Sequence, residues 1–436
     1  MWQFKIRLLL ISIVLCIYSI LPHTLIAEQL QTIKIPSSLN PVGTGARAHG
    51  MGGAFITIAD DATSASWNPG GLDQVKKSEL SIVFACSGRS EHNTFDDYPD
   101  SSGKQSIFQD NLNFMSFTWP FSMKDRKMTL SLNIQHLYDF NREWDFPFLQ
   151  HSSRFITKRD IHLSQKGRLS AFGLAYGIRI NQTFSFGLTF NFWKNISGLN
   201  QWEQTIYENM TKTHLKTGKV TTNRIMSKNK YEFKGFNTNV GFIWRVNHAL
   251  IMGAVVKTPF TADIIHESWF QSTQLQKFSE KETLKMPLSY GISLSYRASD
   301  ALTVSADIYQ TRWDKFMLTD SKNNQTNPIS GLKTWESDID KTTQIRLGME
   351  YLSINKTYVI PLRLGLFYDP APAEKSSDNY YGMSMGTGIS MGGYVFDIAY
   401  QFRYGKNVGK SFLPQLGLSQ NVQEHSLYVS FIYHIQ

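Results

Sequence analysis

The sequence predicts an all-β protein, a fourteen-stranded antiparallel transmembrane β-barrel of an outer membrane with an N-terminal hatch, or plug, inside its lumen. Three observations predict it. Apolar residues alternate with polar or small ones along many segments, short and long gaps between these segments alternate, and a Gly-, Ala- and Ser-rich stretch, 28–77, precedes the first segment. A closed sheet satisfies its own backbone hydrogen bonds in hydrocarbon, so this fold needs no long apolar helix.

The alternation has a period of two. From Phe184 to Phe192, every second residue is aromatic or aliphatic, and Ser, Gly, Thr or Asn stands between. The segments 130–135, 171–178 and 292–296 repeat this pattern. A period of two places alternate side chains on opposite faces of a strand. Since such a strand fits both a soluble sandwich and a membrane barrel, the connections must decide between them.

The gaps between strands favour the barrel. Gaps after even-numbered strands are short, whereas those after odd-numbered strands are long and polar, as in 89–110 and 196–230. Outer-membrane barrels have short periplasmic turns, longer extracellular loops and an even strand number. We also expect Thr261 to Phe270 to extend the seventh strand beyond the membrane. The fourteen predicted strands are 78–88, 111–119, 127–138, 168–180, 183–195, 231–246, 250–258, 289–297, 302–314, 342–352, 357–368, 381–391, 393–403 and 425–434.

The first residues predict export. Lys5 and Arg7 precede an apolar run, and a small-residue cleavage site ends at Ala27, the layout of a secretory signal peptide. The apolar run is shorter than the roughly 20 residues that a spanning helix needs. We therefore expect a signal peptide at 1–27, a hatch at 28–77 and a barrel with long extracellular loops at 78–436.

Charge gives little indication of a nucleic-acid partner. The formal net charge of +9 is spread along the chain, with one basic concentration between Lys194 and Lys230. This stretch is either a solvated loop or a surface that contacts anionic lipid headgroups. We expect no nucleic acid as a partner.

The sequence predicts neither an enzyme nor a cofactor. The strand pattern brings together no Ser, His and acid set, and no clustered His or Cys spacing suggests a metal. Gly50-Met51-Gly52-Gly53 is similar to a dinucleotide-binding turn, but no strong strand precedes it and no Rossmann alternation follows. We therefore expect no catalytic, cofactor-binding or metal-binding residues.

A lumen of fourteen strands is wider than its own side chains can fill, so something must close it. Small residues allow close backbone packing in a confined lumen, and glycine permits the turns that this requires. The stretch 28–77 has this composition. We interpret it as the hatch.

Three segments of the hatch, 45–55 (GARAHGMGGAF), 59–62 (ADDA) and 67–72 (WNPGGL), resemble the N-terminal signature of the FadL-like outer-membrane transport proteins of the FadL/TodX type. Segments 286–316, 345–351 and 361–372 are similar to later parts of the same family. The resemblance implies a fourteen-stranded barrel with a hatch, in the outer membrane of a diderm bacterium. It also implies energy-free uptake of long-chain fatty acids or other hydrophobic molecules.

The resemblance further implies hatch rearrangement, with Asn68-Pro69 as the hatch motif, and release through a lateral opening sought along the third strand, 127–138. No residue of that strand marks a kink. A second branch of the family, the PorV-like proteins, acts as a shuttle or adaptor in protein secretion and has much the same signature. The implied partners are a hydrophobic small molecule, outer-membrane lipids and, in the second branch, secretion-machinery proteins.

Hatch residues are the candidates for gating. Asp60 and Asp61 are either acids of solvated turns or buried acids that pair with Arg47, Arg297 or Arg346. Removing one partner of a buried pair would leave a costly unpaired charge. The full set of candidate hatch and gating residues is Arg47, Gly50, Gly52, Gly53, Asp60, Asp61, Asn68, Pro69 and Gly70.

Each candidate also has a plainer interpretation. Asn68-Pro69-Gly70 consists of turn formers and is either a simple turn or a gate. Gly70 stands where the family usually has alanine. Arg47 could bind a ligand carboxylate through two parallel hydrogen bonds or belong to a structural ion pair. We expect His49 to be a local packing residue.

Overall fold

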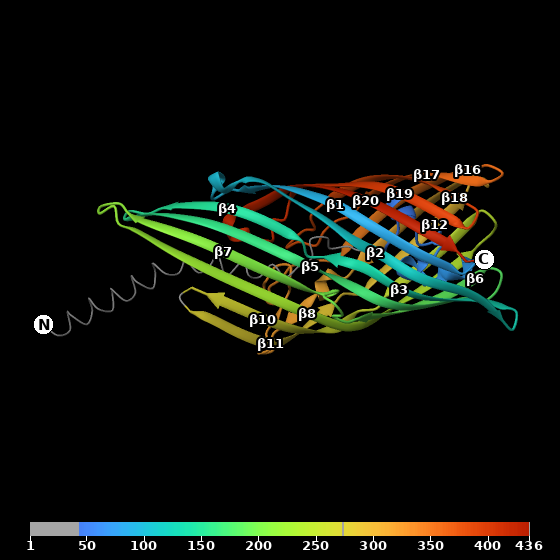
Figure 1. Cartoon of the computed structure of the whole chain (residues 1–436), viewed down its shortest axis with the longest axis horizontal. Helices are drawn as coiled ribbons and strands as arrows, with labels where there is room; N and C mark the ends of the chain where they lie inside the picture. Colours follow the sequence, from blue (N-terminus) through green and yellow to red (C-terminus); the bar gives the residue numbers. More distant parts are fainter. Residues whose placement is uncertain (1–42, 273, 436) are drawn as a thin grey trace.

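The computed structural model describes residues 43–272 and 274–435. The predicted signal peptide and residues 28–42 of the predicted hatch lie outside the described residues. The described strands form one antiparallel sheet, and it closes because β1 (Glu79–Phe95) pairs with β20 (Leu418–His434) (Figure 1). The predicted closed barrel of fourteen wall strands is confirmed. None of the described helices is long and apolar enough to span a bilayer.

Most wall strands are single elements, and the others consist of two consecutive pieces. The single ones besides β1 and β20 are β2 (Gly103–Met123), β5 (Phe155–Arg179), β8 (Val220–Arg245), β16 (Thr342–Ile354), β17 (Tyr358–Tyr368), β18 (Tyr380–Met391) and β19 (Tyr394–Val408). The divided ones are β3 (Arg126–Asp139) with β4 (Arg142–His151), β6 (Phe184–Trp193) with β7 (Asn200–His214), β9 (Leu250–Lys257) with β10 (Phe260–Gln271), β11 (Leu275–Met286) with β12 (Ser289–Arg297), and β13 (Leu302–Thr311) with β14 (Met317–Thr319). A two-residue strand, β15 (Gln325–Thr326), pairs with β14 in a loop.

The predicted long loops are largely strands, which corrects the predicted boundaries. The region 196–230, for example, is mostly the hairpin of β7 and β8, and β1 and β2 both run into 89–110. The predicted extension of the seventh strand is present as β10. The sequence pattern did not reveal these strands because their apolar side chains face the lumen and their polar side chains face outward.

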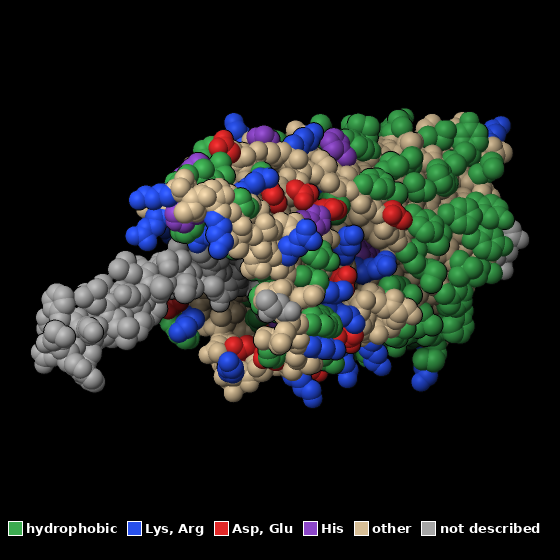
Figure 2. Space-filling view, turned by 60° about the vertical axis from the view of Figure 1, so that its left-hand side comes forward, with side chains coloured by type: hydrophobic (Ala, Val, Ile, Leu, Met, Phe, Trp, Pro, Cys, Tyr) green, Lys and Arg blue, Asp and Glu red, His purple; other side chains and the backbone are tan. Residues whose placement is uncertain are grey.

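The reversal is clear along β5. Near the short turns, Leu174 faces outward and Ala175 faces the lumen, whereas beyond Gly167 the inward Leu163 is buried and the outward Lys166 is exposed. The period of two therefore continues, but the apolar face changes from lipid to lumen. Apolar side chains accordingly cover one half of the outer surface and charged ones the other (Figure 2). Because outer-membrane barrels have short periplasmic turns, we assign the charged half to the extracellular side.

Inside the extracellular half, inward apolar side chains form a large core. Phe140 stacks on Trp202 with ring centroids 4.5 Å apart, and Trp144 and Phe148 are fully buried nearby. The basic stretch found in the sequence lies in this half, where Lys228 forms an ion pair of 2.9 Å with Glu203 on the adjacent strand. Contact of this stretch with lipid headgroups stays a prediction.

The hatch, here residues 43–77, lies in the lumen at the end with the short turns (Figure 1). It contains two short helices, α2 (Ala46–Gly50) and α3 (Ser64–Trp67), and a 3₁₀ helix, η1 (Pro69–Gln74). Its backbone bonds to side chains of distant wall strands. The amides of Phe55 and Ile56 donate to Asp307 at 2.8 and 3.0 Å, and Thr189 donates to the Ala65 carbonyl at 2.8 Å.

Candidate functional site

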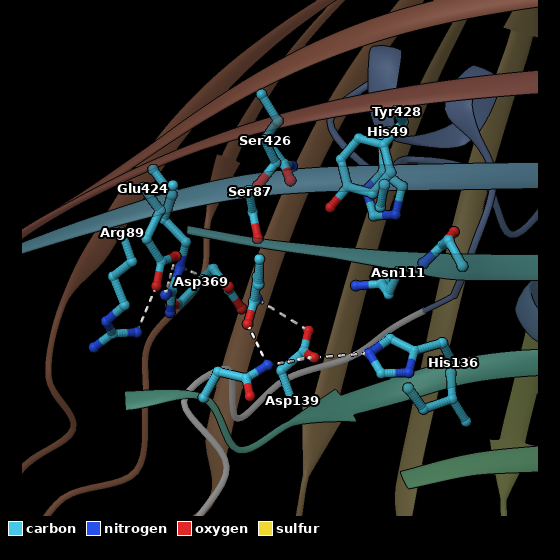
Figure 3. Close-up of a pocket in the computed structure, with 18 of the residues that line it drawn as sticks. His49, Ser87, Arg89, Asn111, His136, Asp139, Asp369, Glu424, Ser426 and Tyr428 are labelled. Carbon is cyan, nitrogen blue, oxygen red and sulfur yellow. Dashed lines mark hydrogen bonds and ion pairs between the residues drawn. The ribbon is translucent and has the colours of Figure 1, made fainter. Parts of the chain in front are cut away.

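A cavity of about 150 Å³ lies on the extracellular face of the hatch. Its floor is aromatic: His49 stacks on Tyr428 of β20 with centroids 3.9 Å apart, and Trp67 meets the His49 ring edge-on. Figure 3 shows His49 and Tyr428 at one end of the cavity and Arg89 with Glu424 at the other. The sequence-based view of His49 as a packing residue therefore omits its place in a cavity wall.

Uncharged polar side chains form a row across the cavity wall. Cross-strand pairing places Gln401 of β19 beside Ser426 of β20, Ser426 beside Ser87 of β1, and Ser87 beside Gln109 of β2. We call these four residues the polar belt. This cavity is therefore not an apolar lumen pocket.

Charged side chains line the extracellular end of the cavity, beyond the polar belt, and form ion pairs with one another. We call Arg89, Arg403, Glu424 and Asp369 the charged rim. Arg89 contacts Glu424 at 2.5 Å, and Arg403 contacts both Glu424 at 2.9 Å and Asp369 at 3.1 Å. Arg346 lies 3.6 Å from Asp369. The cavity thus carries guanidinium and carboxylate groups of both signs, already in contact with one another.

A second cavity, of about 550 Å³, lies on the periplasmic face of the hatch. Arg47, Asp60 and Asp61 line it, together with Glu350 of β16 and Arg363 of β17. The hatch therefore has one cavity on each side. Any molecule that crosses the lumen must pass the hatch or leave the barrel before reaching it.

Arg47 connects the hatch to the wall at this second cavity. Its Nε and Nη2 donate to the two carboxylate oxygens of Glu350 at 2.9 and 2.8 Å, and it forms ion pairs with Asp60 and, at 3.9 Å, Asp61. Glu350 also accepts from Arg363 at 2.6 Å. The structure thus pairs Arg47 with both hatch acids. Arg297 lines the same cavity but forms no ion pair with either acid among the described residues. Asp60 remains nearly half exposed.

Asn68-Pro69-Gly70 begins η1 and packs against the wall. The fully buried Asn68 amide donates to the carbonyls of Ile56 and Phe242 at 3.0 Å each, and its Oδ1 accepts from Gly70 at 3.0 Å. One side chain therefore joins two parts of the hatch and β8. This is a turn in geometry, and its role as a gate stays a prediction.

The other glycine-rich turn of the hatch, Gly50 to Gly53, also packs against the barrel wall. Gly52 and Gly53 have φ of 66° and 75°, the left-handed region that favours glycine. The Gly52 amide donates to Ser384 at 2.8 Å, Ser384 donates to the Gly50 carbonyl at 3.0 Å, and Arg346 donates to the Gly52 carbonyl at 2.9 Å. Gly50, Gly52 and Gly53 thus pack against the wall strands.

Residues 37–381 match the model of the family described as outer membrane protein transport protein (OMPP1/FadL/TodX). The chain belongs to this family. It is therefore an outer-membrane transport protein and not an enzyme. No group of three or more His, Cys, Asp or Glu suited to a metal occurs in the described part of the chain.

Solved structures show the same fold. The toluene transporter TodX of Pseudomonas putida matches with a TM-score of 0.58 and 11% identity, over 92% of this chain and 100% of that one. The toluene transporter TbuX of Ralstonia pickettii matches with a TM-score of 0.52 and 11% identity, over 91% and 100%. A CymD monoaromatic hydrocarbon channel gives 0.52 and 12%, over 91% and 99%. No match was found among curated proteins.

Sequence reasoning did not identify two sets of residues that hold the hatch to the wall of this family member. The first is Asp73, whose buried carboxylate contacts Arg179 at 2.6 Å and Arg245 at 2.8 Å and fixes the end of η1 to β5 and β8. The second is the wall glycines. A Cβ at Gly187 would lie 2.1 Å from the Pro69 carbonyl oxygen, and a Cβ at Gly365 would lie 2.1 Å from the Gly52 amide nitrogen. Inward glycines next to each other on paired strands were the available signal.

The wall of the barrel is interrupted beside the first cavity. β2 pairs with β3 only as far as Phe114 and Gln135, and the pairing of β3 with β5 shifts register between His136 and Tyr138. Beyond this point side chains bridge the gap, because Asn141 donates to Gln109 at 2.6 Å and Gln109 donates to Asp139 at 3.2 Å. The third wall strand is thus broken where no residue in the sequence marks a kink.

Proposed function

We propose that this protein takes up small, largely hydrophobic molecules passively across the outer membrane. The observation that carries the proposal is the cavity on the extracellular face of the hatch, which opens beside the wall interruption between β2 and β3. The similar structures TodX, TbuX and CymD are described as toluene transporters and a monoaromatic hydrocarbon channel. Their descriptions support molecules of single-ring size.

The size of the cavity favours the same ligands over long-chain fatty acids. A cavity of about 150 Å³ in another protein is known to hold benzene, and this one has a similar volume. A long acyl chain would need the hatch to move or the cavity to extend. Long-chain fatty acids remain the alternative ligand.

We also propose lateral release into the membrane at the wall interruption. Side-chain hydrogen bonds through Gln109 bridge this gap, whereas the remaining seams of the described wall are joined by backbone ladders. Side-chain bridges separate without breaking a ladder. In this proposal the hatch blocks the direct route through the lumen to the periplasm. Its contacts with the wall are made by Arg47, which also pairs with Asp60 and Asp61, and by the two glycine-rich turns, 50–53 and 68–70.

Uptake by intact cells tests the function. Cells with and without the gene receive radiolabelled toluene or oleate at limiting concentration, and initial uptake rates are compared. We expect deletion to lower toluene uptake and the plasmid-borne gene to restore it. An oleate defect alone would select the fatty-acid alternative. Unchanged uptake of both, together with stable co-purification of secretion proteins, would refute the transport proposal and favour the secretion adaptor.

A further inference from the structure

We infer that the cavity above the hatch selects an uncharged, ring-sized molecule that carries a hydrogen-bonding group, such as a phenol, over a pure hydrocarbon. This inference rests on the proposed uptake function and specifies its substrate class. It follows from the lining of the cavity, the state of the charges around it and the orientation of its polar atoms.

The lining would oppose a hydrocarbon. The polar belt crosses four adjacent strands, and the next row toward the hatch contains Asn111, the cross-strand partner of Ala85. Apolar cavities of this volume stay dry and accept benzene, whereas polar cavities hold ordered water. A hydrocarbon that displaces such water replaces none of its hydrogen bonds and loses affinity, but a hydroxyl group replaces some of them.

Two of the buried polar atoms at the cavity that lack a hydrogen-bond partner among the described residues belong to uncharged side chains, and the others are the Nε atoms of Arg346 and Arg403. The Asn111 Oδ1 and the His49 Nδ1 are buried, both residues line the cavity, and neither atom accepts or donates a hydrogen bond. They lie near the aromatic floor, at the end of the cavity away from the charged rim (Figure 3). A ligand hydroxyl can donate to the Asn111 carbonyl oxygen while its ring contacts the aromatic floor.

The charged rim disfavours an anionic ligand. Arg89 and Arg403 both contact Glu424, and Arg403 also contacts Asp369. A carboxylate ligand would have to compete with these wall carboxylates for the same guanidinium groups. It would also approach the carboxylates themselves, and like charges at short range repel. A neutral ligand disturbs none of these pairs.

Apolar groups complete the site for a ring. Trp67, Phe367, Ile107 and Leu137 line the cavity together with the polar belt. The lining therefore matches a molecule with an apolar ring and one polar substituent. Aliphatic amphiphiles of the same volume lack the flat face that the aromatic floor can stack against.

Equilibrium dialysis with the detergent-solubilised mature chain tests the inference. Radiolabelled phenol, toluene and benzoate are the probes, and the free concentration of each probe is corrected for its partition into protein-free micelles at the same detergent concentration. We expect saturable binding of phenol at least about tenfold tighter than that of toluene, with benzoate weaker than phenol. Asn111→Leu and Gln401→Leu should each lower the phenol-to-toluene affinity ratio. The control, Gln276→Leu on the exposed part of β11, should leave it unchanged.

The outcomes separate this inference from the uptake proposal. Toluene binding as tight as phenol binding, or equal ratios in Asn111→Leu and Gln276→Leu, would refute the inference while toluene uptake by cells could still stand. No binding of any probe, with unchanged cellular uptake after deletion, would refute both. Heat-modifiable mobility on gels verifies that each variant is folded, and either substitution alone is sufficient for the test.

Discussion

Arg47 and His49 lie two residues apart on α2, yet they line different cavities, Arg47 the periplasmic one and His49 the extracellular one. A single short helix therefore separates the two spaces at this point. The side chain of Arg47 holds this helix to Glu350 on β16, and that of His49 holds it to Tyr428 on β20. Opening a path through the lumen would require at least one of these contacts to break.

Removing the Glu350 carboxylate should loosen the hatch. Glu350 is buried and accepts from both Arg47 and Arg363, so Glu350→Gln removes their shared anion. Arg47 keeps its contact with Asp60, and Arg363 keeps Asp397 at 2.6 Å. Because each guanidinium group retains one carboxylate, we expect a cost below the roughly 3 kcal/mol of a fully broken buried pair. We expect larger and more frequent openings in planar-bilayer conductance.

The matched control is Asp60→Asn, which removes the half-exposed partner of Arg47. Exposed pairs contribute about 1 kcal/mol or less, so this variant should conduct like the wild type. Equal conductance of Glu350→Gln and the wild type would show that this network does not hold the hatch.

Adding one methyl group to the wall should displace the hatch. At Gly187 the new Cβ would meet the Pro69 carbonyl oxygen at 2.1 Å, whereas at Gly88, also in a wall strand, it would meet nothing within 4 Å. Overpacking of this kind costs about 1–3 kcal/mol. Gly187→Ala should therefore lower the temperature of heat-modified gel migration, and Gly88→Ala should not. The contact is dispensable if both variants melt alike.

The sequence was sufficient to predict the barrel because every membrane-spanning strand alternates apolar, lipid-facing residues with small or polar, lumen-facing ones. In β6, Phe184 and Phe192 face outward and Ser185 is buried inside, as period-two alternation requires. Beyond the membrane the outward side chains meet water instead of lipid, so the apolar residues no longer face outward. The strand pattern around Leu163 therefore differs from that of the membrane-spanning part, and the sequence predicts loops there. The apolar core inside the extracellular half, not lipid, sets the pattern there.

The site was less predictable because it depends on pairings across the closed sheet. Asn68 and Arg47 could be selected from local signature, but their partners Phe242 and Glu350 lie far away in sequence. The polar belt combines Ser87 of the first wall strand with Ser426 of the last. Only barrel closure brings them together, and a row of single polar residues on separate strands gives no local motif.

Acidification should tighten two extracellular loops through Asp378. Burial raises the pKa of Asp378 to about 6, although the Gly409 amide donates to its carboxylate at 2.7 Å and Lys410 is near. The folded loop therefore binds a proton at a higher pH than the unfolded chain, whose aspartate pKa is about 3.9. Stability should rise as the pH falls through 6 and be gained in full below the unfolded value.

Hydrogen exchange of residues 369–380 and 404–417, corrected for the intrinsic pH dependence, measures this effect. Protection should be greater at pH 5 than at pH 7.5. Asp378→Asn removes the titrating group, so its protection should not change over this interval. A wild-type protein whose protection falls on acidification would contradict the assignment.

Closing the wall interruption covalently should stop uptake if molecules leave the barrel sideways. Gln109 and Asn141 are joined at 2.6 Å by their side chains across the gap between β2 and the third wall strand. In a Cys86→Ser background, Gln109→Cys with Asn141→Cys places two thiols across this gap. We expect oxidation to abolish toluene uptake and reduction to restore it.

The control pair is Val304→Cys with Met349→Cys. It joins β13 to β16, which are already paired by a backbone ladder, so its oxidation should not change toluene uptake. If the oxidised gap variant transports at the wild-type rate, the ligand must pass the hatch instead, and the Arg47–Glu350 contact becomes the step to test.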